Sequence, residues 1–535
     1  MNLLWKKETN ELGSAFVDIT KKVRSNSAIT SRIAAEEKEF SKKLSESTKI
    51  KTNRLSVTYR ENGNSKFKQQ NWMEAMELYN QSLCYAEIGS ENVSMAYGNR
   101  SACFYHMQMY RKCLQDIALA KEAKYPERLM AKLDKRETDC LKLMTVVGQE
   151  EEFVANLSFE ADANFSGMAN VLQIQRNDTF GRYITANQDI DVGKTVLVEE
   201  AFMLSASTTR SKVCHTCAKT SMNFIACDQC TYAMFCSVEC MQSNNFHKIE
   251  CQCHGFQYLD LPIQHLLRTI FLALQMFPSV DDLMEFVQNT VAGASGLVPA
   301  NVTDLKSKYR SILKLNVFMT SLHRQCFLPE ICKLYSSLMC FPLMKQQFTT
   351  IQKQRFLLHL LGHHICVINS NAFSNHGDQY FTFIIQSYFN HSCIPNLVRF
   401  ECGNKTICTT TRPVKKGDQL FVFYLGYEMK DRQSKANFLQ ENFGFRCKCE
   451  KCVISDWHPI MPLADPEFQH ILRQYRHNEQ AIVNNQNKQL RSELISAGIK
   501  FLRKYGAEPS KFEIGPIEEI FGKLLEIQAN GRLLY

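Results

Sequence analysis

Cysteine and histidine side chains recur at short intervals between residues 214 and 251, in a pattern that suits the binding of metal ions. Most of these cysteines stand two or three residues apart, so one turn of chain would offer two thiolates to one ion. The eight residues are Cys214, Cys217, Cys227, Cys230, Cys236, Cys240, His247 and Cys251. They would fill two tetrahedral zinc sites with no ligand left over, which predicts structural rather than catalytic ions. Because so short a segment cannot form a core of its own, zinc would supply its folding free energy.

A third zinc site is indicated by Cys447, Cys449 and Cys452, which lack a fourth ligand in their own segment. The candidate for the fourth position is Cys393, which stands beside a turn proline in the segment Asn-His-Ser-Cys-Ile-Pro-Asn at 390–396. A closed site made of these four cysteines would hold the C-terminal segment against that turn.

The elements that must position these residues begin with helices. Residues 1–55 read as a basic N-terminal arm, and residues 56–145 read as five amphipathic helices. Within these helices Gly63-Asn64 is repeated as Gly98-Asn99. Paired helices with a repeat of about 34 residues are typical of tetratricopeptide (TPR) repeats.

Strand-like runs follow from Val171 and return at YFTFIIQSYF (380–389), NLVRFE, KTICTTT and QLFVFYLGY. The cysteine block and a helical stretch at 252–368 interrupt this β-rich region, and residues 456–535 read as helical again. The sequence therefore predicts a multidomain α+β protein, in which a β-rich core is split by two insertions.

Composition sets further bounds on the class of protein. The chain has 535 residues, of which 45% are hydrophobic and 22% charged, as in a soluble globular protein. No apolar run is long enough for a membrane span or a secretory signal, so we expect a protein of the cytoplasm and nucleus. In a reducing compartment the 22 cysteines favour metal sites over disulfides. Residues 1–60 hold 13 Lys and Arg against 7 Asp and Glu, and the rest is nearly balanced, so no specific nucleic-acid site is evident.

The spacing of the cysteine block resembles that of the MYND zinc finger. The resemblance implies an interleaved arrangement, with Cys214, Cys217, Cys236 and Cys240 on one ion and Cys227, Cys230, His247 and Cys251 on the other. MYND fingers generally serve protein contacts, and the resemblance implies a proline-rich peptide as one candidate partner.

Three further motifs, the 390–396 segment, the strand from Gly417 that ends at Tyr424, and the Cys-x-Cys-x2-Cys tail, resemble the SET domain of protein lysine methyltransferases. A SET domain split by a MYND finger marks the SMYD family, and the TPR-like helices are most similar to its TPR-bearing fourth branch. The resemblance implies a split SET domain at 168–426 that contains the finger at 214–251 and a helical insert at 252–368. A post-SET zinc segment at 427–455 and a C-terminal helical region at 456–535 would follow.

The implied activity is methylation of lysine in histone or non-histone proteins, with S-adenosylmethionine (SAM) as cofactor. By resemblance, Tyr424 lines the methyl-transfer channel, Asn390 and His391 bind the cofactor, Asn371 reaches its methionine part, and Phe445 packs on its adenine. Gly181 and Arg182 lie where the family usually carries Gly-x-Gly, but Tyr183 replaces the second glycine. This departure keeps an alternative open, an adaptor protein whose SET domain is a weakly active or inactive scaffold.

The TPR-like helices also carry side chains that suit a carboxylate clamp of the kind that holds the EEVD terminus of heat-shock chaperones. Arg60 and Asn64 lie four residues apart and share a helix face. Asn99 stands at the matching place of the second repeat, and Lys132 and Arg136 lie four apart on the fifth helix. Cations are common on exposed helix faces, so coincidence is the competing interpretation.

Overall fold

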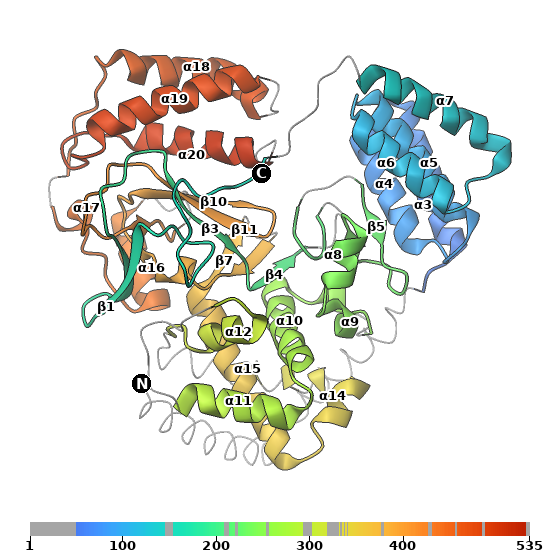
Figure 1. The fold of residues 1–535 in the computed structure, drawn as a ribbon, viewed down its shortest axis with the longest axis horizontal. Helices are drawn as coiled ribbons and strands as arrows, with labels where there is room; N and C mark the ends of the chain where they lie inside the picture. The colour runs from blue at the N-terminus through green and yellow to red at the C-terminus, as the bar shows by residue number, and fades with distance from the viewer. Residues whose placement is uncertain are drawn as a thin grey trace.

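The computed structural model describes residues 50–144, 153–207, 213–219, 223–252, 256–292, 302–317, 331–375, 379–425, 431–454, 457–483 and 487–530, with gaps at 332, 333, 336 and 340. Most of the predicted basic arm, up to residue 49, lies outside these ranges. Figure 1 shows the N-terminal helices at one end, the C-terminal helices over the strands, and a group of helices below both.

Five N-terminal helices pack in sequence order as antiparallel neighbours. They are α3 (Asn53–Lys68), α4 (Trp72–Tyr85), α5 (Glu91–His106), α6 (Tyr110–Glu122) and α7 (Glu127–Met144). The side chain of Asn71 accepts a hydrogen bond from the Glu74 N–H and so caps the start of α4. The repeated glycines allow close packing, because a Cβ on Gly63 would lie 2.6 Å from the Tyr79 ring and one on Gly98 would lie 2.5 Å from the Tyr125 ring.

The β-rich core consists of small sheets that join distant parts of the chain. Strand β3 (Thr195–Glu200) pairs with β11 (Lys405–Thr410), and β11 pairs with β10 (Leu397–Cys402). Strand β4 (Met203–Ala206) pairs with β8 (Gln379–Thr382), which pairs with β7 (Ala372–Asn375). Strands that precede the cysteine block thus pair with strands that follow the helical stretch, as expected for an interrupted unit. A hairpin of β1 (Leu172–Asn177) and β2 (Gly181–Ala186) lies beside them.

One predicted strand proved wrong. The apolar run 380–389 was expected to be extended throughout, but β8 ends at Thr382 and a 3-10 turn, η2 (Gln386–Tyr388), follows. After it, β9 (Asn390–His391) pairs in parallel with β12 (Phe421–Val422). The helical turn in place of a strand has a direct cause in a buried carboxylate, which is described below.

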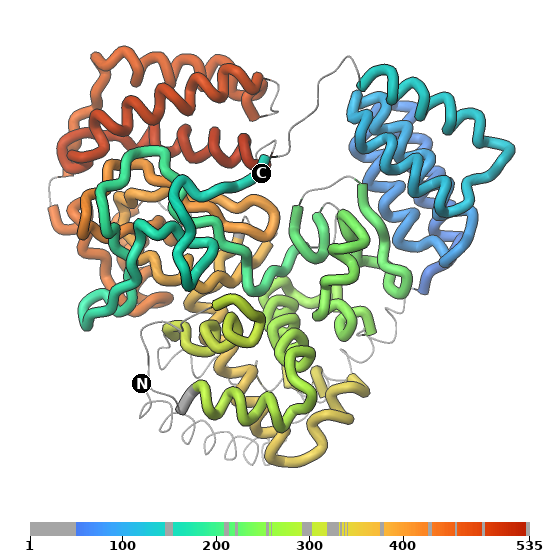
Figure 2. The backbone as a smooth tube through the Cα atoms, in the orientation of Figure 1, coloured from blue at the N-terminus to red at the C-terminus, as the bar shows by residue number. Residues whose placement is uncertain are grey.

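The cysteine block forms a compact unit between the N-terminal helices and the helical stretch. It contains the short strands β5 (Ile225–Ala226) and β6 (Met234–Phe235) and the helices α8 (Val238–Ser243) and α9 (His247–Glu250). Its apolar side chains Phe224, Met234 and Phe235 belong to the same buried cluster as the N-terminal helices. The backbone trace shows the block between these helices and α10 (Leu261–Met276), the first helix of the helical stretch (Figure 2).

The helical stretch shares one apolar core with the strands. Its helices are α10 (Leu261–Met276), α11 (Val280–Ala292), α12 (Leu305–Leu313), α14 (Pro342–Gln347) and α15 (Ile351–Asn371). Helix α15 runs directly into β7, so Asn371 stands at the junction of a helix and a strand.

The C-terminal helices form a separate apolar cluster that lies on β10. Helices α16 (Arg432–Phe443) and α17 (Glu450–Val453) flank the last cysteines, and α18 (Pro466–Val483), α19 (Lys488–Tyr505) and α20 (Gly515–Asn530) pack together. Arg412 joins α20 to the core through an ion pair with Glu518 at 2.9 Å. Among the described residues, no helix has the length and apolar character that crossing a membrane requires.

Candidate functional site

The eight ligand candidates of the cysteine block form two clusters with the interleaved partition that the resemblance implied. Cys214 lies with Cys217, Cys236 and Cys240, and Cys227 lies with Cys230, His247 and Cys251. Zinc–sulfur bonds of about 2.3 Å require tetrahedral edges of about 3.8 Å between sulfurs. The Cys217–Cys236 and Cys227–Cys251 sulfur distances are 3.6 and 3.8 Å, so both clusters have the size of a zinc site.

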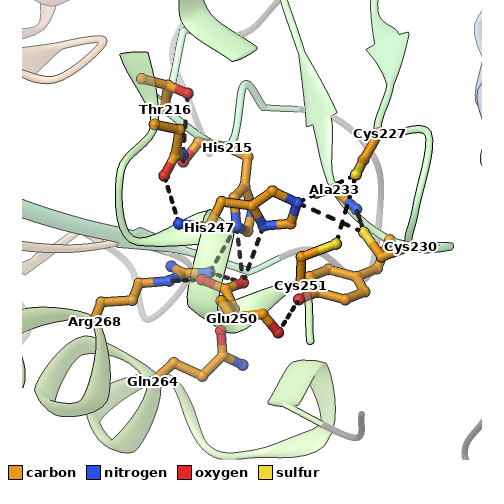
Figure 3. Close-up of polar contacts among 12 residues, drawn as sticks. His215, Thr216, Cys227, Cys230, Ala233, His247, Glu250, Cys251, Gln264 and Arg268 are labelled. Carbon is orange, nitrogen blue, oxygen red and sulfur yellow. Dashed lines mark hydrogen bonds and ion pairs between the residues drawn. The ribbon is translucent and has the colours of Figure 1, made fainter. Parts of the chain in front are cut away.

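A buried polar network backs the second cluster (Figure 3). The Glu250 carboxylate lies 2.9 Å from the His215 Nε2 and 2.9 Å from the Arg268 Nε, and Arg268 belongs to α10. Burial alone would raise the pKa of Glu250, but the charges of Arg268 and His215 hold it well below its usual range. His215, His247 and Glu250 lie close enough together to resemble a metal site, yet the Arg268 guanidinium already supplies the cation. The network therefore ties the cysteine block to the helical stretch.

The third predicted cluster is also assembled. Cys393 lies 3.9 Å from Cys447 and 3.5 Å from Cys452, sulfur to sulfur, and Cys449 completes the group. Because Phe445 precedes Cys447 by two residues, this cluster holds Phe445 beside the 390–396 segment. The rings of Phe445 and His391 lie 6.3 Å apart.

Two chain segments cross where the predicted cofactor pair lies. Strands β9 and β12 run in parallel, and the Ser392 N–H donates to the Val422 carbonyl at 3.1 Å. Asn396 locks this crossing with both ends of its amide, since its Nδ2 donates to the Gln419 carbonyl and its Oδ1 accepts from the Phe421 N–H. Asn396 thus has a structural role that the sequence motif alone did not reveal.

Tyr424 follows the crossing and has a fixed orientation. Its hydroxyl donates to the Phe389 carbonyl at 2.7 Å, and its backbone N–H donates to the His391 Nδ1 at 3.1 Å. Burial raises the pKa of Tyr424 well above its usual value, so the phenol stays neutral. Burial lowers the pKa of His391 to about 4, which agrees with an Nδ1 that accepts a hydrogen bond.

Aromatic rings surround Tyr424. The Phe443 ring lies 5.1 Å from the Tyr424 ring and 6.4 Å from the Phe445 ring, and the His391 ring lies 5.4 Å from Tyr424. Sequence reasoning missed Phe443, although its place two residues before Phe445 was a signal. Together these rings make an aromatic wall beside the Tyr424 ring.

The β1–β2 hairpin contacts the crossing, and the α15–β7 junction lies near the hairpin. The Asn390 Nδ2 donates to the Phe180 carbonyl at 3.3 Å, and the Asn371 Nδ2 donates to the Asn316 carbonyl at 2.7 Å. Gly181 has a φ of +65°, and a Cβ on it would lie 3.5 Å from the Asn316 Nδ2. Asn316, which the sequence analysis did not single out, bonds to Asn371 and lies near Gly181.

Arg182 and Tyr183 point in different directions, as neighbours on a strand do. The Arg182 guanidinium lies 4.6 Å above the Tyr388 ring, and its Nη1 lies 3.4 Å from the Tyr388 hydroxyl. The Tyr183 ring instead contacts the half-exposed Phe180, at 5.8 Å. The side chain that replaces the second glycine is thus packed along the hairpin, away from Tyr388.

Among the clamp candidates on the N-terminal helices, Asn64 and Asn99 contact each other. The Asn99 Nδ2 donates to the Asn64 Oδ1 at 2.8 Å, and the Arg136 Nη1 donates to the Gly98 carbonyl at 2.9 Å. The Arg60 Nε is buried and has no hydrogen-bond partner within the part of the chain that the structure describes. Lys132 is exposed on α7.

Known proteins with similar sequences or folds carry SET domains. Residues 181–425 match the family model of the SET domain. The chain is 23% identical to protein-lysine N-methyltransferase SMYD4 of Mus musculus, over 79% of this chain and 70% of that protein. It is 22% identical to a SET and MYND domain-containing protein of Dictyostelium discoideum, over 58% of this chain and 86% of that protein. A solved SET domain of LSMT, bound to lysine and AdoHcy, shares 11% identity over 58% of this chain and 60% of its own, with a TM-score of 0.27. Residues 181–425 therefore match a SET domain, and the chain is similar to proteins that carry SET and MYND domains (the SMYD proteins).

Proposed function

We propose that this protein is a SAM-dependent protein-lysine N-methyltransferase that acts on histone or non-histone proteins. The observation that carries the proposal is the β9–β12 crossing, which fixes Tyr424 and which the β1–β2 hairpin and Phe445 beside the last cysteine cluster both contact. The name of the mouse relative, a protein-lysine N-methyltransferase, supports the same reaction.

The residues near Tyr424 fit the cofactor in their chemistry. The left-handed backbone at Gly181 offers an approach without a side chain, and Phe445 offers an aromatic face for an adenine ring. When bound, SAM supplies a methyl group on a sulfonium. Asn390, His391 and Asn371 would orient the cofactor, as the resemblance implied.

The chain's own residues prepare the incoming lysine. The Tyr424 hydrogen is committed to the Phe389 carbonyl, so the phenol oxygen presents its lone pairs to an amine N–H. The rings of Tyr424, Phe443 and Phe445 exclude water, and a dry environment favours the neutral amine that must attack. A lysine has an unperturbed pKa of about 10.4, so this shift towards the neutral form is a requirement for reaction at pH 7.

The test combines SAM binding with turnover. The purified chain should bind SAM in a calorimeter, and Tyr424→Phe and Asn390→Ala should each lower turnover at least about tenfold, which is about 1.4 kcal/mol of barrier. Tyr505→Phe is the control, because Tyr505 bonds to Asp465 within the C-terminal helices. Methylation that survives both site variants contradicts the proposal.

We also propose that the three cysteine clusters hold three zinc ions, two in a MYND finger at 214–251 and one at Cys393, Cys447, Cys449 and Cys452. The sulfur separations support this count, because they match tetrahedral edges in each cluster. A division into TPR-like helices, a split SET domain and a C-terminal helical region completes the proposal, with the protein placed in cytoplasm and nucleus. A proline-rich partner of the finger stays a prediction.

A second candidate function is that of an adaptor which binds an acidic C-terminal peptide through the N-terminal helices. The contact between Asn64 and Asn99 and the Arg60 Nε, which has no hydrogen-bond partner among the described residues, favour it, since an amide pair and a guanidinium suit a terminal carboxylate. The loss of the second glycine at Tyr183 favours the same reading, with the SET domain as scaffold.

A fluorescent peptide that ends in EEVD tests the adaptor function. Binding should be micromolar, weaken with added salt, and fall at least tenfold in Lys132→Ala. The control is Lys135→Ala, which removes an exposed cation from the same helix. Arg136→Ala is a less direct test, because Arg136 also donates a hydrogen bond to the Ser101 hydroxyl at 2.7 Å and its loss would disturb the packing of the helices. Equal binding by Lys132→Ala and Lys135→Ala ends the clamp hypothesis.

A further inference from the structure

A buried carboxylate in the β-rich core receives three consecutive backbone N–H groups. Glu199 lies on β3 and is 9% exposed. Its Oε1 accepts from the N–H groups of Ile384 and Ile385 at 2.7 and 2.9 Å, and its Oε2 accepts from that of Gln386 at 2.8 Å. A carboxylate deprived of water needs such partners, and consecutive amides that converge on one anion are an efficient way to supply them.

These bonds determine the path of the chain after β8. An extended strand points successive N–H groups to opposite edges, so three consecutive ones cannot meet at one carboxylate. The segment therefore leaves the extended conformation and forms the turn η2, in place of the strand that its apolar sequence predicted. The cause is a residue 185 positions away in the sequence.

After Ser387, the next three residues all contact the candidate site, two of them at the β1–β2 hairpin and one at Tyr424. The guanidinium carbon of Arg182, on the β1–β2 hairpin, lies 4.6 Å from the centre of the Tyr388 ring. The Phe389 carbonyl accepts the hydrogen bond from Tyr424, and the Asn390 amide donates to the hairpin at Phe180. Moving this short segment would therefore displace the hairpin, the tyrosine and the cofactor pair together.

We propose that Glu199 is a positioning residue of the methyl-transfer site, which fixes residues 384–386 and thereby places Phe389 for Tyr424 and Asn390 for the cofactor. The proposal rests on the proposed function for the identity of the ligand. Glu199 does not touch the reacting atoms, and it acts through the η2 segment.

The chain offers a matched control in the next residue. Glu200 is exposed on the opposite face of β3, where its carboxylate accepts from the Asn404 Nδ2 at 2.6 Å. Glu199→Gln removes the charge and turns an amide NH2 towards one of the three N–H donors, so a donor faces a donor. Glu199→Asp keeps the charge but draws the carboxylate back by one methylene. Glu200→Gln makes the same chemical change without touching η2.

The experiment measures SAM affinity by calorimetry and hydrogen–deuterium exchange of peptides that cover 383–388 and the β3–β11 pair. We expect Glu199→Gln to weaken SAM binding about tenfold and to speed exchange at 384–386 about tenfold. Exchange in β3–β11 and the melting temperature should stay close to wild type, because a purely structural loss would change those as well. Glu199→Asp should fall between wild type and Glu199→Gln, and Glu200→Gln should match wild type.

The proposal is overturned if Glu199→Gln and Glu200→Gln bind SAM with equal affinity and protect the amides of 384–386 from exchange equally well. If the Glu199 variants fail to fold, hydrogen–deuterium exchange of the wild-type chain tests the proposal. Amides of 384–386 that exchange as slowly as those of the β3–β11 pair support the anchor, and exchange as fast as in exposed loops refutes it. Wild type that binds no SAM refutes the proposed function instead, while the exchange measurement still reports on the anchor.

Discussion

Replacing Arg100 by methionine should separate the N-terminal helices from the cysteine block. Arg100 lies on α5, and its side chain is 0% exposed. Its Nε and Nη2 donate to the two carboxylate oxygens of Asp116, each at 2.7 Å. Its Nη1 donates to the Asn80 Oδ1 at 2.6 Å and to the Phe224 carbonyl at 3.0 Å, and Phe224 belongs to the cysteine block.

The magnitude follows from what remains after the guanidinium is removed. Asp116, which is also 0% exposed, would keep only the bond from the Asn223 amide to its Oδ1 at 2.7 Å. The Phe224 carbonyl would lose the bond that Arg100 supplies. Removing one partner of a buried ion pair costs about 3–5 kcal/mol, because the other charge is left without compensation. At about 4 kcal/mol, the equilibrium for opening this region rises nearly a thousandfold.

Hydrogen–deuterium exchange of peptides from α5, α6 and 223–236 measures that opening. The double variant Arg100→Met/Asp116→Leu should recover most of the loss, because it leaves no unpaired charge. Arg128→Met is the matched control, since the Arg128–Glu91 pair is exposed and contributes at most about 1 kcal/mol. If Arg100→Met opens this region no more than Arg128→Met does, the pair does not join the two units and the reasoning is wrong.

Three further predictions concern zinc, pH and the C-terminal helices. Elemental analysis should return three zinc ions per wild-type chain and two per Cys393→Ser chain. Equal zinc contents in the two proteins would show that Cys393 is not part of a third site. Burial, together with Arg268, lowers the pKa of His265 to about 3, so the unfolded chain binds a proton that the folded chain does not. The free energy of unfolding should therefore fall from about pH 6.5 towards pH 3, by up to ~1.4 kcal/mol per pH unit. In His265→Gln, the melting temperature should depend less steeply on pH over this range. Arg412→Gln should loosen α20 from the core by about 1–3 kcal/mol, because it breaks a largely buried pair with Glu518, and faster exchange confined to α20 would show it.

Local spacing predicted most of the metal ligands of this protein, while the resemblance to the MYND finger implied how eight of them divide between two clusters. Zinc ligands must lie within a few ångströms of one ion, so many of them have only two or three residues between them in the chain. The sequence shows that spacing directly. The 390–396 segment, Tyr424 and Phe445 were likewise visible as motifs. The five N-terminal helices could be predicted because their apolar periodicity and their caps at residues such as Asn71 are local as well.

The tertiary structure alone decided which distant residues hold these motifs in place. Glu199 reads as an ordinary strand residue, yet it ends a predicted strand through amides 185 positions away. Arg100 reads as a helix-surface cation, yet it is fully buried and bonds to the cysteine block across 124 positions. Common residue types carry no pattern for such contacts, because burial and partners depend on how the whole chain packs. The sequence by itself therefore determined the ligands and the family motifs, and packing decided their alignment around Tyr424.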